Sequence, residues 1–429
     1  FHAHPEAGWT EFRTAALIIR RLRELGYAIR MGEAACASDR RMGVPSSAVL
    51  AAARERALEH GADAELVAGM GDGYTGFWAD LDCGPGPVTA FRFDMDCNEV
   101  AECAEESHRP MREGFASRWP GLMHACGHDG HAAVGLGLAE VLVSIRRHLR
   151  GRIRLIFQPA EEGARGALPM SEAGAVDGVD VLFGFHIGFK AEGPGSLICG
   201  TQGFLATTKR DVLFSGVPAH AGAAPEEGKD ALLAACSAVV NLHAISRNGK
   251  GGTRIAVGRL EGGEARNVIP ASARLFMETR GETTELDAYM TAESERILRA
   301  SADLWGCACE WRTVGNSAGG GSSPELARLI ATVAEAMGGW KTVIPMSGFG
   351  ATEDFACLMS RVQASGGLAS YLQVGTDRAA GHHSDRFDFD ETCLGRALEL
   401  LARLAVRMAG DRKTLKRRRR ATWNFWMRS

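Results

Sequence analysis

The chain has 429 residues, of which 45% are hydrophobic and 24% charged, so its length predicts two or three domains with ample core. A net charge of −3 gives no reason to expect nucleic acid or an anionic membrane as partner, and no apolar run reaches the length of a membrane span. Eleven cysteines without regular spacing are typical of reduced thiols, so we expect a cytoplasmic protein. The chain opens at Phe1, and we expect its natural start to lie upstream.

The first 75 residues predict one helix and a covering segment. Thr10 precedes apolar residues at helical spacing, and Gly26 is expected to end that helix. His2 and His4 could be metal ligands, although ordinary turn residues are the favoured interpretation. Residues 31–75 are interpreted as an insertion that covers one side of the core and carries no chemistry.

Carboxylates follow the first buried strand. Residues 88–93 (VTAFRF) have the apolar character of such a strand and lead directly into Asp94 and Asp96. Open α/β sheets collect their ligands at the carboxyl ends of strands, so these side chains are candidates for a site. A solvated strand end is the alternative.

The segment 122–131, LMHACGHDGH, places Cys126 and His128 one residue apart. A thiolate and an imidazole in one turn can both reach a zinc-like ion. Apolar residues at helical spacing follow, so the pair is expected at a helix N-terminus, where the dipole would stabilise the thiolate. A histidine-rich loop that caps a helix is the alternative.

Two further strands end in polar residues. Residues 153–157 (IRLIF) lead to Glu161 and Glu162, which would point opposite ways in an extended chain and so divide their tasks between a metal and the substrate. A strand at 180–187 contains His186. A charged loop and a buried core histidine are the respective alternatives.

The pattern changes at about residue 205 and returns at about 317. Between these points the sequence predicts a small inserted α+β module that carries His220, Asn267 and Arg280. Its expected strands are 209–217, 254–260 and 271–280, and its expected helices are 229–247 and 283–304. The predicted domains are therefore 1–205 and 317–410 for the main domain, 206–316 for the module, and 411–429 for a basic tail.

The last part of the main domain predicts helices at 325–337 and 354–361 and a strand at 370–375, which leads to His382 and His383. A final amphipathic helix follows. The tail is basic and aromatic, a composition that can bind nucleic acid or membrane. The favoured interpretation is an extension that has neither function.

Five candidate ligands come from strand ends or helix starts of one predicted α/β domain. They are Cys126, His128, Glu162, His186 and His383. Together they suffice for two divalent ions with a shared ligand, which could polarise a carbonyl group. Glu161 would then be free to act as general base, and the chemistry predicted is amide hydrolysis.

Six segments in order along the chain resemble the M20 metallopeptidases, and specifically their amidohydrolase branch. They are MHACGHDGH (123–131), QPAEEG (158–163), the strand-end His186, GVPAHAG (216–222), GGEARNVIP (262–270) and GHHS (381–384). Other segments, such as AHPEAGWTEFRT near the start, resemble branch members that cleave p-aminobenzoyl-glutamate, a folate breakdown product.

The resemblance implies roles for the residues at matching positions. Cys126, expected as the bridging ligand, binds metal with His128, Glu162, His186 and His383, and Glu161 is the general base. Asp94 and Asp96 orient these ligands. In the module, His220 reaches a neighbouring active site and stabilises the oxyanion, while Asn267 and Arg280 hold the substrate carboxylate. His382 is the alternative to His383, and a salt bridge within the module is the alternative role for Arg280.

The resemblance also implies the architecture and partners. We expect an α/β fold with a mixed-sheet, zinc-peptidase-like catalytic domain and an inserted α+β lid and dimerisation domain. Manganese or zinc is expected, with cobalt or nickel also compatible with the ligands. The chain is expected to form a homodimer through the lid or a heteromer with a second, homologous chain. Two alternative functions remain, namely a general N-acyl-amino-acid amidohydrolase or dipeptidase, and an inactive partner in a heteromer.

Overall fold

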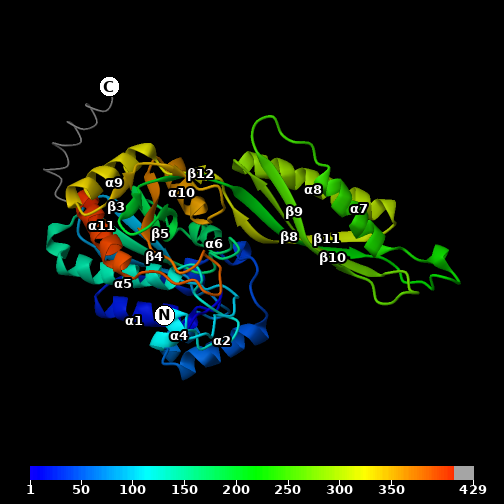
Figure 1. Ribbon diagram of the computed structural model, residues 1–429, viewed down its shortest axis with the longest axis horizontal. Coiled ribbons are helices and arrows are strands. Elements are labelled where there is room, and N and C mark those ends of the chain that lie inside the picture. Colours follow the sequence, from blue (N-terminus) through cyan, green and yellow to red (C-terminus); the bar gives the residue numbers. More distant parts are fainter. Residues whose placement is uncertain (410–429) are drawn as a thin grey trace.

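The computed structural model describes residues 1–409, so the predicted basic tail, residues 411–429, lies outside the described residues. The larger part of the molecule is built on an eight-stranded sheet in the order β1-β2-β4-β3-β5-β15-β6-β13 (Figure 1). Its strands are β1 (Ala28–Met31), β2 (Phe77–Asp82), β3 (Val88–Asp94), β4 (Arg152–Gln158), β5 (Val181–Glu192), β6 (Ser196–Ile198), β13 (Thr342–Ile344) and β15 (Leu368–Thr376).

The four central strands, β4, β3, β5 and β15, run parallel, whereas β1 and β2 are antiparallel additions at one edge. Parallel strands need cover on both faces, and all but the first residue of β3 are buried. The sheet is therefore mixed, as the sequence predicted. Because these parallel strands end at the same edge, the loops that follow them converge there.

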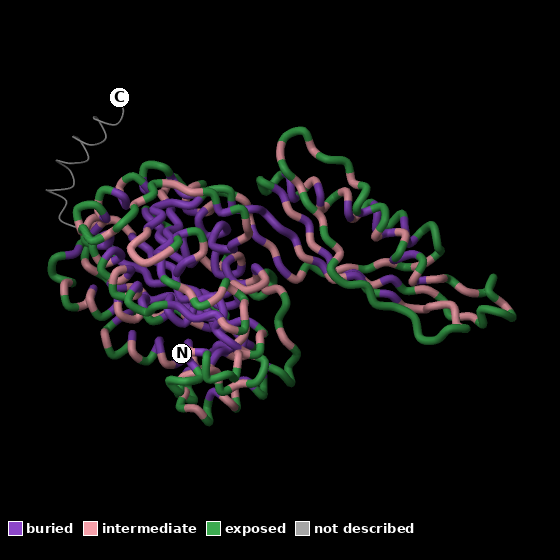
Figure 2. The backbone as a smooth tube through the Cα atoms, viewed as in Figure 1, coloured by how far each residue is buried: buried purple, intermediate pink, exposed green. Residues whose placement is uncertain are grey.

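Helices form a hydrophobic core on each face of the sheet. One core includes side chains from α1 (Phe12–Glu24), α5 (His128–Ser144), α9 (Pro324–Met337) and α11 (Thr392–Ala409). A second core lies around α6 (Ala167–Glu172) and α10 (Phe355–Ala364). The other helices of the larger part are α2 (Ser47–Glu59), α3 (Ala64–Gly69) and α4 (Arg109–Glu113). Figure 2 shows that most of the buried backbone lies in this larger part of the molecule.

The inserted module has a four-stranded antiparallel sheet in the order β11-β8-β10-β9. Its elements are β8 (Ala206–Ser215), α7 (Ala231–His243), β9 (Thr253–Gly262), β10 (Ser272–Gly281), α8 (Thr284–Leu304) and β11 (Ala308–Ser317). Burial alternates along β10, because one face of the sheet packs on both helices and the other face is open. The module projects away from the larger part (Figure 1).

A small three-stranded sheet lies beside the junction between the module and the larger part. It consists of β7 (Thr201–Phe204), β12 (Gly320–Gly321) and β14 (Ser347–Gly348). Thr352 donates its hydroxyl to the carbonyl of Leu205, and Ser317 donates to the carbonyl of Glu353. Both chain connections of the module are thus hydrogen-bonded to the segment 352–353.

Several sequence expectations were wrong in detail. Strands β1 and β2, which flank residues 31–75 and extend the central sheet, were not expected, whereas α2 and α3 within this segment cover α1 as expected. Thr10 does not cap α1; Glu11 occupies the N-cap position, and the Thr10 hydroxyl donates to the carbonyl of Ala7. Strand β11 was not expected. Within residues 1–409, no helix combines the length and apolar character needed to cross a bilayer.

His2 is held in an ionic cluster, contrary to its interpretation as an ordinary turn residue. Its two ring nitrogens lie 2.8 Å from Asp129 and 3.1 Å from Glu102. Burial opposes the charge of His2, but the hydrogen bonds to these carboxylates outweigh it and raise its pKa to about 10. The cluster fixes the first residues of the chain against the start of α5, since Asp129 belongs to the first turn of that helix.

Candidate metal centre and catalytic residues

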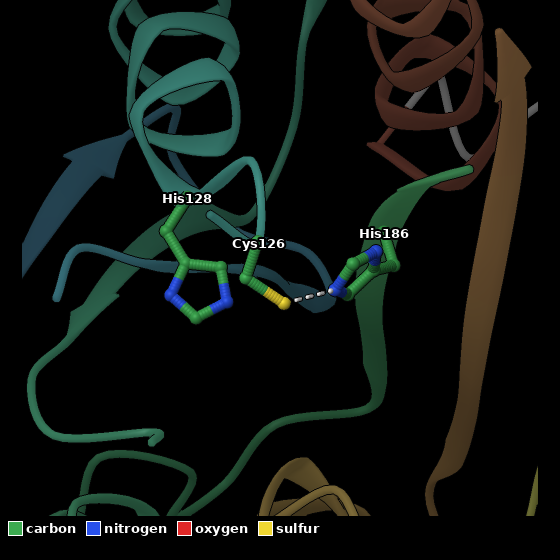
Figure 3. Close-up of side chains that lie close together, drawn as sticks. All are labelled: Cys126, His128 and His186. Atoms are coloured by element: carbon green, nitrogen blue, oxygen red, sulfur yellow. Dashed lines mark hydrogen bonds between the residues drawn. The ribbon is translucent and has the colours of Figure 1, made fainter. Parts of the chain in front are cut away.

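The predicted ligands of the larger part all lie at the carboxyl edge of the central sheet. Cys126 and His128 occupy the start of α5, and Gly127 between them is the N-cap with φ of 85°. Glycine adopts this left-handed conformation without strain, which allows the sharp turn between the two ligands. His186 lies within β5, and its Nε2 is 3.5 Å from the sulfur of Cys126 (Figure 3).

The hydrogen bonds of the histidines decide which ring nitrogens are free. His128 Nδ1 lies 2.9 Å from the carbonyl of Asp96, and His186 Nδ1 lies 2.9 Å from the carbonyl of Ile187. A carbonyl only accepts, so Nδ1 carries the proton in both rings. The lone pair of each Nε2 is therefore available to a metal, and Cys126, His128 and His186 all place ligand atoms within 4.8 Å of one another.

Two neighbouring histidines have no nitrogen to spare. His131 accepts the backbone N–H of Ile187 on Nε2 and binds Asp94 through Nδ1 at 2.5 Å. His382 lies 3.1 Å from the carbonyl of Ile187 and 2.8 Å from Arg378. His383 differs, because its Nε2 lies 3.3 Å from Glu162 Oε1 and it forms a potential ligand group with Cys126 and Glu162. This arrangement favours His383 over His382 as a ligand.

Asp96 anchors the loop that carries the paired glutamates. Its carboxylate, which is fully buried, accepts the backbone N–H groups of Glu161 and Glu162, each at 3.0 Å. The loop is a turn bracketed by Ala160 and Ala164, whose φ values are 48° and 62°, so the expectation of an extended chain here was wrong. Non-glycine residues in this region are strained, and such strain is found at functional sites.

Asp94 lies behind the histidines. It binds His131 and accepts a 2.5 Å hydrogen bond from Arg92 Nη1, while its Oδ2 is 3.9 Å from His128 Nε2. Asp94 is therefore placed to orient His131, as Asp96 is placed to orient the loop of Glu161 and Glu162.

Burial dominates the chemistry of the thiol. Burial and the nearby charge of Glu162 raise the pKa of Cys126 to about 12, so the expected stabilisation of the thiolate by the helix dipole does not prevail. For Glu162, burial is outweighed by the hydrogen bond from His383 and the charge of His128, which lower its pKa to about 2. Glu162 is therefore negatively charged in the absence of a metal ion, whereas the thiol of Cys126 needs a nearby cation to lose its proton.

Glu161 lies among other carboxylates. Burial, and then the charges of Glu353, Glu162 and Asp354, raise its pKa well above the ordinary value. Its carboxylate remains 3.9 Å from His128 Nε2. A carboxyl group whose proton affinity is raised in this way is suited to general base catalysis at neutral pH.

Sequence reasoning missed a buried network beneath Glu161. Arg92 is fully buried and contacts Asp94, Glu353 at 2.9 Å and Asp354 at 3.2 Å. Tyr371 donates its hydroxyl to Glu353. No spacing in the sequence indicates these contacts, because Arg92 and Glu353 are 261 residues apart.

Glu11 was also missed. One of its carboxylate oxygens accepts the backbone N–H of Ala160, and the other accepts the hydroxyl of Thr75. Burial and the charge of Asp96 raise the pKa of Glu11 to about 8. Glu11 thus holds the loop of the paired glutamates from the side of α1.

The donor set fits divalent metal ions. His128 Nε2 is buried and has no hydrogen-bond partner within the described chain, as a ligand atom awaiting a cation requires. One sulfur, three imidazole nitrogens and a carboxylate suit zinc, and they also allow manganese, cobalt or nickel. Three overlapping ligand groups share Cys126, His128 or Glu162, so two neighbouring positions are available.

The module residues do not meet in one protomer. His220 pairs with Val268 in an isolated bridge, and Ala221 donates its N–H to the carbonyl of Asn267. His220 and Asn267 therefore lie beyond Ser272, the first residue of β10. Arg280 lies at the other end, next to the junction. Ten residues of strand separate the two ends by roughly 30 Å.

The model of the peptidase family M20/M25/M40 matches residues 90–407. The chain belongs to this family. The match covers α5, the paired glutamates, the module and His383, and this M20 chain is an enzyme of the peptidase family.

Curated relatives cover almost the whole of this M20 chain. It is 45% identical to one of the subunits of p-aminobenzoyl-glutamate hydrolase from Escherichia coli strain K12, over 95% of this chain and 93% of that protein. It is 44% identical to indole-3-acetyl-aspartic acid hydrolase of Enterobacter agglomerans, over 96% of this chain and 94% of that protein.

Solved structures share the architecture. An aminobenzoyl-glutamate utilization protein from Klebsiella pneumoniae superposes with a TM-score of 0.80 at 38% identity, covering 94% of this chain and 92% of that chain. A Bacillus subtilis protein described as a dinuclear metal-binding peptidase of the M20 family superposes with a TM-score of 0.63 at 25% identity, covering 94% of each chain. The α/β fold with a mixed-sheet main domain and an inserted α+β module is thereby confirmed.

The two adjacent histidines provide a matched test of the ligand set. We expect His383→Ala to lower the metal bound per chain, because it removes a free ring nitrogen, whereas His382→Ala should retain the metal since both of its nitrogens are already bonded. Metal content after exhaustive dialysis, measured by mass spectrometry, checks this. Loss of metal from His382→Ala alone would show that the ligand has been assigned to the wrong residue.

Proposed function

We propose that this M20 enzyme hydrolyses the amide bond of an N-acyl amino acid, and that p-aminobenzoyl-glutamate is a substrate. The observation that carries the proposal is the convergence of ring nitrogens and a thiol on Glu162, with Glu161 beside them. The identities of 45% and 44% to two hydrolases of acyl-amino acid conjugates support the substrate class.

We propose that two divalent ions, manganese or zinc first, are held by Cys126, His128, Glu162, His186 and His383. Such ions, when bound, polarise the amide carbonyl and lower the pKa of water. His128 and His186 are already fixed by the carbonyls behind them, so little rotation is needed on binding.

Glu161 is the proposed general base. Its raised proton affinity allows it to take a proton from the attacking water and then deliver that proton to the leaving nitrogen. Its backbone is fixed by Asp96, so the carboxylate can work without reorganising the loop. Asp94 and Asp96 act by positioning, since their oxygens are bonded to His131 and to the loop.

The module, residues 206–316, is the proposed lid and dimerisation domain between catalytic segments 1–205 and 317–410. Strand β9 is an unpaired edge of its sheet, and Val240 of the adjoining α7 is 71% exposed. Exposed edges and apolar helix faces of this kind form interfaces between protein chains. A second copy of the chain, or a homologous partner chain, would then deliver His220 to the oxyanion, while Asn267 and Arg280 bind the substrate carboxylate.

We propose a cytoplasmic location. All eleven cysteines are free, which fits a reducing compartment.

Substitution of the proposed base tests the mechanism. Glu161→Gln should retain both metal ions and lose about 10²–10⁴-fold in kcat, because the amide cannot accept the proton. The measurement is turnover of p-aminobenzoyl-glutamate by the manganese-loaded protein, with the exposed Glu59→Gln as control. An active Glu161→Gln protein would exclude Glu161 as the base.

The substrate preference has a separate test on the unaltered enzyme. Faster turnover of an aliphatic dipeptide than of p-aminobenzoyl-glutamate would exclude the proposed preference.

A hybrid dimer tests the origin of His220. A dimer that combines a His220→Ala chain with a Glu161→Gln chain should recover about half of the normal activity, because one of its two sites has both groups. The hybrid is isolated with two different affinity tags and assayed beside each parent homodimer. An inactive hybrid would show that His220 serves its own protomer, and failure of the chain to self-associate would favour a heteromer with a second, homologous chain.

A further inference from the structure

Lys209 lies on the open face of the module sheet at the end nearest the metal centre. It belongs to β8, in which Thr208 and Arg210 are buried towards the helices while Lys209 is only half-buried on the other face. Its neighbours across the sheet are Glu278 on β10 and Gly315 on β11. Lys209 therefore projects from the face of the sheet that has no helices.

The stem of the Lys209 side chain lies beside Gly315 of the neighbouring strand β11. Glu278 is already engaged by Arg280, with an Nε to Oε1 distance of 2.8 Å. A methyl group added to Gly315 would lie 3.2 Å from Lys209 Cδ and would collide with the carbonyl oxygen of Gly163. The lysine stem thus crosses the space that Gly315 leaves open, towards the loop of the paired glutamates.

The ammonium group has no ionic partner. Among residues 1–409 the side chain of Lys209 forms no hydrogen bond and no ion pair. The carbonyl of Gly163, which follows the proposed ligand Glu162 in the chain, lies against the same Gly315 that the Lys209 stem contacts. A half-buried, unpaired lysine this near to the metal ligands is available for an anionic group of a bound molecule.

Arg280 lies on the same face as Lys209. The two residues are diagonal neighbours on the antiparallel pair of β8 and β10, because Lys209 is opposite Glu278 and Arg280 is opposite Thr207. Diagonal neighbours of this kind lie about 7–8 Å apart, and long side chains on them can reach one ligand. This end of the sheet therefore places the unpaired ammonium of Lys209 beside the guanidinium of Arg280, which is bonded to Glu278.

We propose that Lys209 is a specificity residue that binds the side-chain carboxylate of an acidic amino acid, while Arg280 binds its α-carboxylate. The substrate class is then N-acyl glutamate or N-acyl aspartate, rather than N-acyl amino acids in general. The inference rests on the proposed amidohydrolase function. The acidic residues named in the two relatives, glutamate in one and aspartate in the other, agree with it.

A pair of substrates that differ in one charge tests this assignment. p-Aminobenzoyl-glutamate and p-aminobenzoyl-glutamine share the acyl group, the scissile bond and the α-carboxylate. We expect the unaltered enzyme to prefer the glutamate substrate by at least about tenfold in kcat/KM, and Lys209→Met to bring that ratio close to one, mainly through KM. Lys209→Arg should restore part of the preference, because it restores the positive charge.

The controls separate this proposal from the function on which it rests. Lys341→Met, which removes an exposed lysine of the larger part, should leave the ratio unaltered. A ratio that Lys209→Met does not change, or equal losses for both substrates, would overturn the role of Lys209 while leaving the hydrolase function intact. If the unaltered, metal-loaded enzyme hydrolysed neither substrate nor any other N-acyl amino acid, the function and the role of Lys209 would both be wrong.

Discussion

The carboxylate of Asp96 is the contact on which the site depends. It accepts the backbone N–H groups of Glu161 and Glu162, and the carbonyl of the same residue accepts the Nδ1 proton of His128. One buried residue at the end of β3 thus sets the positions of the proposed base and of two proposed ligands. Because the carboxylate replaces the water that would otherwise solvate those N–H groups, it stabilises a turn whose flanking alanines have strained backbone conformations.

The second constraint is a surplus of buried negative charge. Burial of a carboxylate is costly unless a cation or several hydrogen-bond donors compensate it. Within the described residues, Arg92 is the fully buried guanidinium among the acidic groups of the site, and it contacts three of them. The acidic residues around it are Asp94, Asp96, Glu161, Glu162, Glu353 and Asp354. Divalent cations would balance this surplus, and the remaining imbalance gives Glu161 its high proton affinity.

The sequence predicted the elements that carry local patterns. The central strands and α5 were predicted because apolar runs and helical spacing are local, and the five proposed ligands followed from strand ends and from the resemblance of motifs to the M20 family. The role of Arg92 could not be predicted, since its partners Glu353 and Asp354 are distant in the chain and an arginine inside a strand resembles a surface residue. The resemblance had favoured His383 over His382, and the hydrogen bonds of both rings give the physical reason. The separation of His220 from Arg280 needed the strand register of the module.

Anomalous X-ray diffraction from crystals of the zinc- or manganese-loaded protein is the measurement that tests the central claim most directly. The account predicts two anomalous peaks at the carboxyl edge of the central sheet, both among the side chains of the proposed ligands, with Cys126 among them. His128, His186, Glu162 and His383 should complete the coordination through the atoms left free by their other hydrogen bonds. Peaks bound to other side chains, or none at this edge at a saturating metal concentration, would contradict it.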